Sequence, residues 1–293
     1  MRISYNPACT LHNSSFEEDV ELCEKAGFEY IELRIEKIKK YLVNHTIGDL
    51  ATLFSSKRIR PHAINVIYTY SDFLSKNDHA ESSKKVLDDI MLCCEVSQGL
   101  KVKDLVVVPP MYTELENRNY DFPWAKNLED NTRIFSGIAD IVEPYDMRIG
   151  IEIVGAPRCS IRTVEQCNMV ISSVNKKNVG YTLDAFNLYL YSKDDSFVDV
   201  KNTDADRVFI VHVNGGDDKE LISLRQSHRN YVNKGVMNVI NYISNLKAIG
   251  YTGPVSIEFF RQDQWERPSN EVINEAYTTT AEMLRSCGVI EEK

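Results

Sequence analysis

Four apolar segments in the second half of the chain each end in a side chain that can bind a metal ion. The four side chains are those of Glu152, Asp184, His212 and Glu258. Each lies among large apolar residues, and an ionised carboxylate is rarely buried without a partner because its desolvation is costly. One shared divalent cation would satisfy all four groups. Carboxylate oxygens with one imidazole nitrogen suit Mn²⁺, Mg²⁺, Co²⁺ or Zn²⁺, and ligand type alone does not choose among them.

A different reading is that each of these residues forms its own ion pair with an arginine from a nearby loop. The candidate arginines are Arg158, Arg225, Arg229 and Arg261. All four residues lie at the ends of apolar segments, and this shared position favours one common cation. Two earlier residues, Glu32 and Asn65, lie at comparable depth and either line the same pocket or are satisfied inside the protein. His62 follows Pro61 near a segment start, so we expect a structural role for it.

The segments that carry these groups are typical of buried β-strands. Eight such strands are predicted, at Arg2–Asn6, Tyr30–Arg34, Arg60–Val66, Asp104–Val108, Arg148–Ile153, Val179–Asp184, Arg207–Val213 and Val255–Phe259. Stretches with helical spacing of apolar residues separate them. The first predicted helix opens at Ser15 with Glu18 three residues later, which is a capping-box pattern, and it ends at Gly27.

Strands that are apolar on both faces and alternate with helices indicate a parallel sheet covered by helices. Eight repeats in 293 residues favour a closed (β/α)₈ TIM barrel, whose working residues come from the C-terminal ends of its strands. The first strand is not followed by the glycine pattern of a dinucleotide-binding sheet. We expect one TIM-barrel domain over residues 1–293, with the longest irregular segments at Pro109–Ala125 and Asn214–Gly235.

Composition restricts the partners and the location that we expect. The net charge of −9 argues against a nucleic-acid surface, which usually carries a basic stripe, and favours a small polar substrate. No signal peptide or apolar stretch long enough to span a membrane is visible, so we expect a soluble cytoplasmic protein without a membrane partner. The seven cysteines include no C-x-x-C pair and are expected to be free thiols.

The chain resembles the xylose-isomerase-like barrels of sugar isomerases and epimerases. Within them it is most similar to the inosose (2-keto-myo-inositol) isomerases of bacterial inositol catabolism. The likeness covers nearly the whole chain. It is carried by Asn6-Pro7-Ala8-Cys9-Thr10-Leu11, Leu22-Cys23-Glu24-Lys25-Ala26-Gly27, Tyr30-Ile31-Glu32-Leu33-Arg34, Glu152-Ile153-Val154-Gly155, Asn178-Val179-Gly180, Leu183-Asp184-Ala185-Phe186 and Glu258-Phe259-Phe260-Arg261.

The resemblance implies a role for each residue of the predicted site. Glu152, Asp184, His212 and Glu258 fill the places of the family's metal ligands. The implied reaction moves a proton between neighbouring carbons of a metal-bound ketose or inosose through a cis-enediolate, with Glu152 and Glu258 as acid and base. We expect the substrate, a small polyol or ketose, to be contacted by Asn65, Asn187, Arg229 and Arg261.

Three positions depart from the family pattern. The family usually has histidine three residues after the metal aspartate, where this chain has Asn187. Ala156 replaces the histidine that close relatives carry after the first metal glutamate, and Asn214 stands where an acid is common. Asn187 can still hydrogen-bond a hydroxyl but cannot exchange a proton near neutral pH. These changes bear on the identity of the substrate more than on the fold.

Several alternatives stay open at this point. A dehydratase of the inosose or dehydroshikimate type would share the metal site but expel a hydroxyl, and a non-catalytic relative would bind the metal only. An apurinic endonuclease on the same barrel needs more histidines than the six present and a basic groove. Members of the family often form dimers or tetramers, so a homo-oligomer is also expected. The segment Gln262–Pro268, with Trp265, is expected to cover the mouth, meet a neighbouring subunit or form plain loop.

Overall fold

Eight parallel strands close into a barrel in the computed structural model, which describes residues 1–112 and 123–290. The barrel strands are β1 (Arg2–Tyr5), β2 (Tyr30–Arg34), β3 (Arg60–Tyr68), β4 (Asp104–Val108), β5 (Arg148–Glu152), β6 (Val179–Asp184), β7 (Val208–Val213) and β10 (Pro254–Ile257). All eight lie where the sequence predicts them, with ends that differ by at most two residues. The predicted TIM-barrel fold is therefore confirmed.

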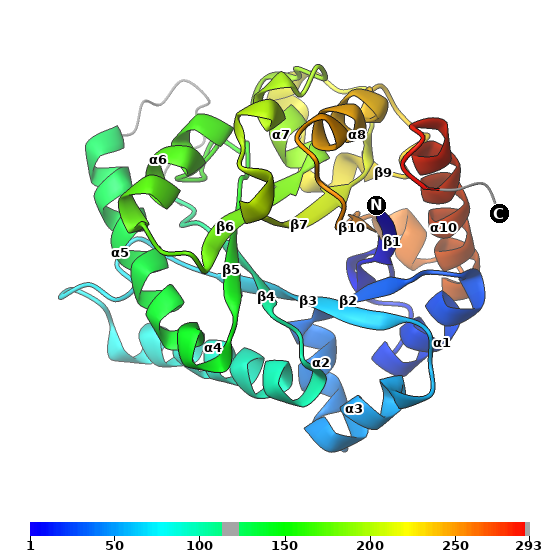
Figure 1. The fold of residues 1–293 in the computed structure, drawn as a ribbon, viewed down its shortest axis with the longest axis horizontal. Coiled ribbons are helices and arrows are strands. Elements are labelled where there is room, and N and C mark those ends of the chain that lie inside the picture. Colours follow the sequence, from blue (N-terminus) through cyan, green and yellow to red (C-terminus); the bar gives the residue numbers. More distant parts are fainter. Residues whose placement is uncertain (113–122, 291–293) are drawn as a thin grey trace.

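Helices surround the strands on the outside of the barrel (Figure 1). They are α1 (Phe16–Ala26), α2 (Ile35–Tyr41), α3 (Ile47–Ser55), α4 (Ala80–Leu100), α5 (Trp124–Val142), α6 (Val164–Val174), α7 (Ala185–Ser192), α8 (Val239–Ala248), α9 (Gln262–Trp265) and α10 (Ser269–Ser286). The last barrel strand, β10, pairs with both β1 and β7 and so closes the ring. The Met1 ammonium donates to the carbonyl of Val289 at 2.9 Å, which brings the two ends of the chain together.

The first helix begins and ends as its sequence predicts. The Ser15 hydroxyl accepts the backbone N–H of Glu18, and the Glu18 carboxylate accepts that of Ser15, which completes the capping box. Gly27 ends α1 at a φ of 104°, a left-handed conformation that glycine adopts without steric cost. The apolar residues Phe16, Val20 and Cys23 are buried, so this face of the helix packs onto the barrel.

Two packed layers hold the strands in place. The larger layer lies between the strands and the helices, and a smaller one fills the barrel interior. The interior residues are Ala63, Val66, Val106, Val108, Val154, Cys159, Phe209 and Ile210. A filled interior blocks any passage through the barrel, so a ligand can enter only at one of its ends. The seven cysteines are free, as expected.

The segment after β7 is more ordered than its sequence suggests. Within the expected irregular stretch Asn214–Gly235, β8 (Gly215–Gly216) pairs antiparallel with β9 (Arg229–Asn230). Strands of two residues are too short to show an alternating pattern, which explains why the sequence did not reveal them. A Cβ atom on Gly215 would lie only 2.2 Å from the carbonyl oxygen of Lys234, so glycine is required for this close approach.

The other expected irregular segment, Pro109–Ala125, is only partly described. Residues 113–122 lie outside the described part of the chain, and α5 already begins at Trp124. Among residues 1–112 and 123–290, no helix is long and apolar enough to cross a membrane.

Candidate metal centre

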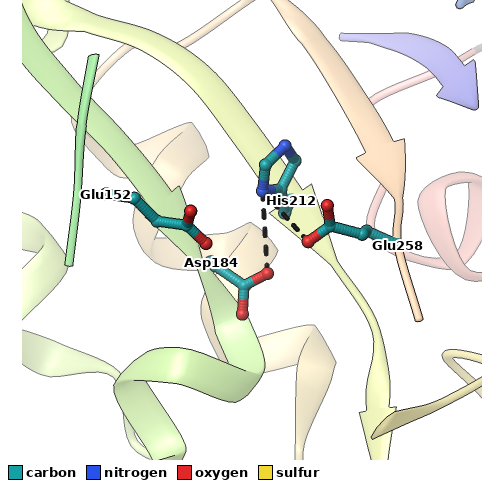
Figure 2. Close-up of side chains that lie close together, drawn as sticks. All are labelled: Glu152, Asp184, His212 and Glu258. Atoms are coloured by element: carbon teal, nitrogen blue, oxygen red, sulfur yellow. Dashed lines mark ion pairs between the residues drawn. The ribbon is translucent and has the colours of Figure 1, made fainter. Parts of the chain in front are cut away.

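The four predicted metal ligands meet at the C-terminal end of the barrel. Glu152 and Asp184 are the last residues of β5 and β6, His212 is next to last in β7, and Glu258 directly follows β10. Register aligns them, since His212 lies opposite Asp184 on one side and Ser256 on the other. Their side chains point toward one another, and one ligand atom from each lies within 4.8 Å of all the others (Figure 2). All four are buried.

The histidine presents an unpaired nitrogen to this cluster. His212 Nε2 lies 3.0 Å from a carboxylate oxygen of Glu32, and because a carboxylate only accepts, Nε2 must carry the proton. His212 Nδ1 is buried and has no hydrogen-bond partner among the described residues. It lies 3.7 Å from Asp184 Oδ2 and 3.5 Å from Glu258 Oε2. Two carboxylates facing this nitrogen require a positive charge close by, from a proton on the imidazole or from a metal ion, and the donor set fits a metal ion.

The electrostatics of the cluster show the same demand for positive charge. Burial lowers the pKa of His212, but the charges of Glu258 and Glu32 outweigh it and raise this pKa to about 10. Burial and the nearby Glu258 carboxylate raise the pKa of Glu152 above its ordinary range. The buried Glu258 carboxylate contributes to both shifts, so negative charge is in excess here. A divalent cation at this point would relieve it.

One arginine also enters the cluster. Arg229 Nη1 contacts Asp184 Oδ2 at 2.5 Å and Glu258 Oε2 at 2.8 Å, and its side chain is buried. The alternative of separate ion pairs is therefore correct for Arg229, which serves two carboxylates. Arg261 instead pairs with Asp217 and with Asp263. Arg34 adds a longer contact, 3.8 Å from its Nη1 to Glu258 Oε1, and among the described residues no arginine forms an ion pair with Glu152, so the three carboxylates can still accommodate a further cation.

A second layer of polar side chains orients the ligands. Asn6 Nδ2 donates to Glu32 at 2.9 Å and to Glu258 Oε1 at 2.7 Å. Asn65 Nδ2 spans the same two carboxylates, at 3.0 and 3.4 Å. The Asn214 amide donates to Asp184 Oδ2 at 3.2 Å. Neutral amides at these points hold the carboxylates in place without neutralising them, which leaves their charge available to a cation.

A cavity of about 340 Å³ opens directly above the centre. Its lining residues are Arg34, Asn65, Val66, Tyr68, Val108, Met111, Glu152, Val154, Asn187, Gln226, Arg229, Glu258 and Phe260. The lining combines the polar groups of Glu152 and Glu258 with apolar side chains that include Val66, Val108 and Phe260. Such a cavity suits a small ring or chain with hydroxyls on one side and C–H groups on the other.

The structure brings most of the predicted substrate residues to this cavity. Asn65, Asn187 and Arg229 line it, whereas Arg261 is not among its lining residues. The segment with Trp265 forms α9, and the indole Nε1 donates to the carbonyl of Ala8 at 3.0 Å. Trp265 is not among the lining residues of the cavity either.

Sequence reasoning missed several lining residues, among them Arg34, Gln226 and Phe260. Arg34 and Phe260 do lie within segments that carry the family resemblance, which is the signal that could have identified them. Gln226 lies in a loop without a local pattern. The role of Glu32 was left open, and the structure places it against the imidazole of His212 rather than among the residues that line the cavity.

Comparison with known proteins agrees with this geometry. The sequence profile of the xylose isomerase-like TIM barrel family matches residues 20–287, and the chain belongs to that family. The inosose isomerase of Bacillus licheniformis is 31% identical over 97% of this chain and 98% of its own length. That of Bacillus subtilis is 30% identical over the same shares. The crystal structure of the IolI protein with a bound zinc atom superposes with a TM-score of 0.87, at 29% identity, and covers 98% of this chain and 99% of that one.

Proposed function

We propose that this chain is a divalent-metal-dependent isomerase that acts on an inosose or a closely related ketose. The observation that carries the proposal is the position of His212 Nδ1. It lies among the carboxylates of Glu152, Asp184 and Glu258 and has no hydrogen-bond partner among the described residues. It occurs in a chain that is similar to inosose isomerases over nearly its full length. A small polyol or ketose fits the adjoining cavity, whose wall is polar on the side of this centre.

The proposed ligands are Glu152, Asp184, His212 through Nδ1, and Glu258. A divalent cation held there would polarise a substrate carbonyl and make the neighbouring C–H more acidic. Zn²⁺, Mn²⁺, Co²⁺ and Mg²⁺ all suit three carboxylates with one imidazole. Asp184 and His212 do not line the cavity, so their role is to hold the ion from below.

The two glutamates that do line the cavity are the proposed acid and base. Glu258 accepts hydrogen bonds from Asn6, Asn65 and Arg229, which stabilise it as a carboxylate. Glu152 accepts one side-chain hydrogen bond, from Asn187. Glu152, which accepts fewer hydrogen bonds, is therefore the better base for removing the proton next to the carbonyl. Glu258 or the protonated Glu152 would return a proton to the neighbouring carbon.

A solvent-exchange experiment tests this function and separates it from a dehydratase. Metal-loaded protein is incubated with 2-keto-myo-inositol in D₂O, and the products are followed by NMR and mass spectrometry. An isomerase incorporates deuterium next to the carbonyl without loss of water, and Glu152→Gln abolishes the exchange. Formation of a dione with loss of water would instead establish the dehydratase. A metal-loaded protein that is inert toward a panel of ketoses and inososes would favour a non-catalytic relative.

The expectations on partners, location and domain organisation remain part of the proposal. A net charge of −9 supports a protein without a nucleic-acid partner, because phosphate-binding surfaces carry basic stripes. We also propose a single domain, a cytoplasmic location and a homo-oligomeric state. Light scattering of the purified protein would test the last of these.

A further inference from the structure

A chain of three hydrogen bonds runs along the rim of the cavity and ends on Glu152. Arg229 Nε donates to Gln226 Oε1 at 2.7 Å. Gln226 Nε2 donates to Asn187 Oδ1 at 2.7 Å. Asn187 Nδ2 then donates to Glu152 Oε1 at 2.8 Å. We call Arg229, Gln226 and Asn187 the amide arc.

The direction of every bond in the amide arc is fixed by its two ends. A guanidinium can only donate, so Gln226 must turn its oxygen toward Arg229 and its nitrogen toward Asn187. A carboxylate can only accept, so Asn187 must turn its nitrogen toward Glu152. Neither amide can flip without placing two donors or two acceptors against each other.

Two members of the amide arc, Arg229 and Asn187, are also held by proposed metal ligands. Arg229 Nη1 is held by Asp184 and Glu258, two of the proposed metal ligands. The backbone N–H of Asn187 donates to Asp184 Oδ1 at 2.7 Å, because Asp184 caps the N-terminus of α7. Asn187 is buried, and Gln226 is half-buried on the loop that follows β8. The arc thus connects three of the four proposed ligands.

We propose that Gln226, acting through Asn187, is a positioning residue that sets the orientation of the Glu152 carboxylate. The proposal rests on the function proposed above and deepens it at the same site. With Oε1 held by Asn187, Oε2 has no hydrogen bond among the described residues and is left for the metal centre and the substrate proton. Correct alignment of a base with the C–H bond affects kcat more than substrate affinity.

This role changes what Asn187 offers to a substrate. Its oxygen is occupied by Gln226, and one of its two N–H groups is occupied by Glu152. The second N–H of Asn187 and the second lone pair of its oxygen remain for a substrate. The residue that replaces the family's usual histidine therefore serves first to orient a carboxylate.

Gln226→Glu tests the arc with the smallest change of shape. Glutamate still accepts from Arg229 but cannot donate to Asn187, which breaks the chain in its middle. The matched control is Gln262→Glu, the same change on an exposed residue of α9. Three quantities are measured for each variant: kcat and KM for inosose, bound metal per chain, and the visible spectrum of the Co²⁺-substituted, substrate-free protein.

We expect Gln226→Glu to keep one metal ion per chain, to lower kcat by about 10- to 100-fold with little change in KM, and to shift the Co²⁺ spectrum. The control should match the wild type in all three quantities. Gln226→Met, which removes both polar atoms, should lower kcat and shift the spectrum in the same way. A Gln226→Glu protein with wild-type kcat and spectrum, or one in which only KM rises, would overturn the proposal.

A double-mutant cycle provides a second, independent test. If Gln226 acts only through Asn187, the loss of kcat in Asn187→Ala should not deepen when Gln226→Met is added. Losses that multiply would show that the two residues act separately and would contradict the arc. The Co²⁺ spectrum distinguishes the two proposals, since it needs no turnover. If the wild type is inert with inosose but its spectrum responds to Gln226→Glu, the amide arc is supported and the proposed function is wrong. If the wild type binds no Co²⁺, both proposals are wrong.

Discussion

Charged residues lie at both ends of the barrel, and they are partnered in opposite ways. At the N-terminal end, Asp104 of β4 lies opposite Arg148 of β5 and accepts two hydrogen bonds from its guanidinium, at 2.7 and 2.8 Å. The guanidinium also lies over the ring of Phe209, 4.1 Å from its centroid. One acid thus meets one base in a fork geometry. At the C-terminal end, Arg229 pairs with two of the three carboxylates, Arg34 lies 3.8 Å from Glu258, and His212 Nδ1 has no hydrogen-bond partner among the described residues.

The difference separates charges that belong to the scaffold from charges that belong to a reaction. A matched pair needs nothing further from solution. An excess of buried acceptors costs free energy. It is retained at sites where a bound cation or substrate supplies the balancing charge. In such barrels, residues at the N-terminal face generally serve stability, and residues at the C-terminal face serve chemistry. Substitutions at the N-terminal end should therefore leave kcat and metal binding unchanged, whereas those at the C-terminal end should reduce them.

Glu258→Gln should have the largest effect. Loss of the proposed acid–base carboxylate is expected to lower kcat by about 10²- to 10⁴-fold, because proton transfer by a positioned group contributes this much. Steady-state kinetics with inosose measures it. Asp104→Asn at the other end serves as the control and should keep wild-type kcat. A Glu258→Gln enzyme within threefold of wild type would show that the comparison between the two ends is wrong.

Addition of a metal ion should stabilise the protein substantially. A divalent cation at about 100 times its dissociation constant adds about 2.7 kcal/mol to the free energy of unfolding, because it binds only the folded centre. Thermal denaturation with and without Mn²⁺ or Zn²⁺, and after chelation, measures this gain. It should disappear in Asp184→Asn and persist in Asp104→Asn. An equal gain in both variants would place the binding site elsewhere.

Glu32→Gln should weaken metal binding by about 10- to 100-fold, as the loss of an orienting hydrogen bond to a ligand usually does. Glutamine has one oxygen in place of two, so its amide nitrogen must face either the donors of Asn6 and Asn65 or Nε2 of His212, which weakens the orienting bond. Competition with a chromogenic chelator gives the affinity. Glu29→Gln, the same change on the residue just before β2, is the matched control. An unchanged metal affinity in Glu32→Gln would show that Glu32 does not orient His212.

Asp104→Asn should have the smallest effect, a change of less than about 1 kcal/mol in the free energy of unfolding. Burial raises the pKa of Asp104 in spite of Arg148, so the charged form adds little net stability. Arg148 also keeps its contact with Phe209 when the charge is lost. Urea denaturation measures the change. A loss of more than about 3 kcal/mol in the free energy of unfolding would mean that Asp104 and Arg148 behave as a fully buried charge pair.

The sequence predicted the residues at the strand ends of the site and only some of those that lie outside the strands. Glu152, Asp184, His212 and Glu258 were identifiable because a polar residue at the end of an apolar strand is a local pattern. No local pattern shows which loop arginine turns inward. Arg229 and Arg261 were equivalent candidates, and only the folded loop places Arg229 against Asp184, 45 residues away in the sequence.

The amide arc escaped prediction for the same reason. Gln226 meets Asn187 across 39 residues, through a loop whose two-residue strands leave no periodicity to recognise. Asn187 itself was predicted as a substrate contact and as a departure from the family pattern, but not as a residue that orients Glu152. Its orienting role depends on the direction of two amide groups, which follows from the fixed polarity of Arg229 and Glu152 and not from any residue spacing.

The metal centre itself is tested most directly by anomalous diffraction from crystals grown with Mn²⁺ or Zn²⁺. We predict one anomalous peak between Glu152, Asp184, His212 and Glu258, with Nδ1 of His212 and the carboxylate oxygens about 2.0–2.2 Å from the ion. Asn187 should still donate to Glu152, and Glu32 should still hold Nε2 of His212. A peak at another site, coordination through Nε2, or an ion-free centre in crystals that contain the metal elsewhere would contradict the account.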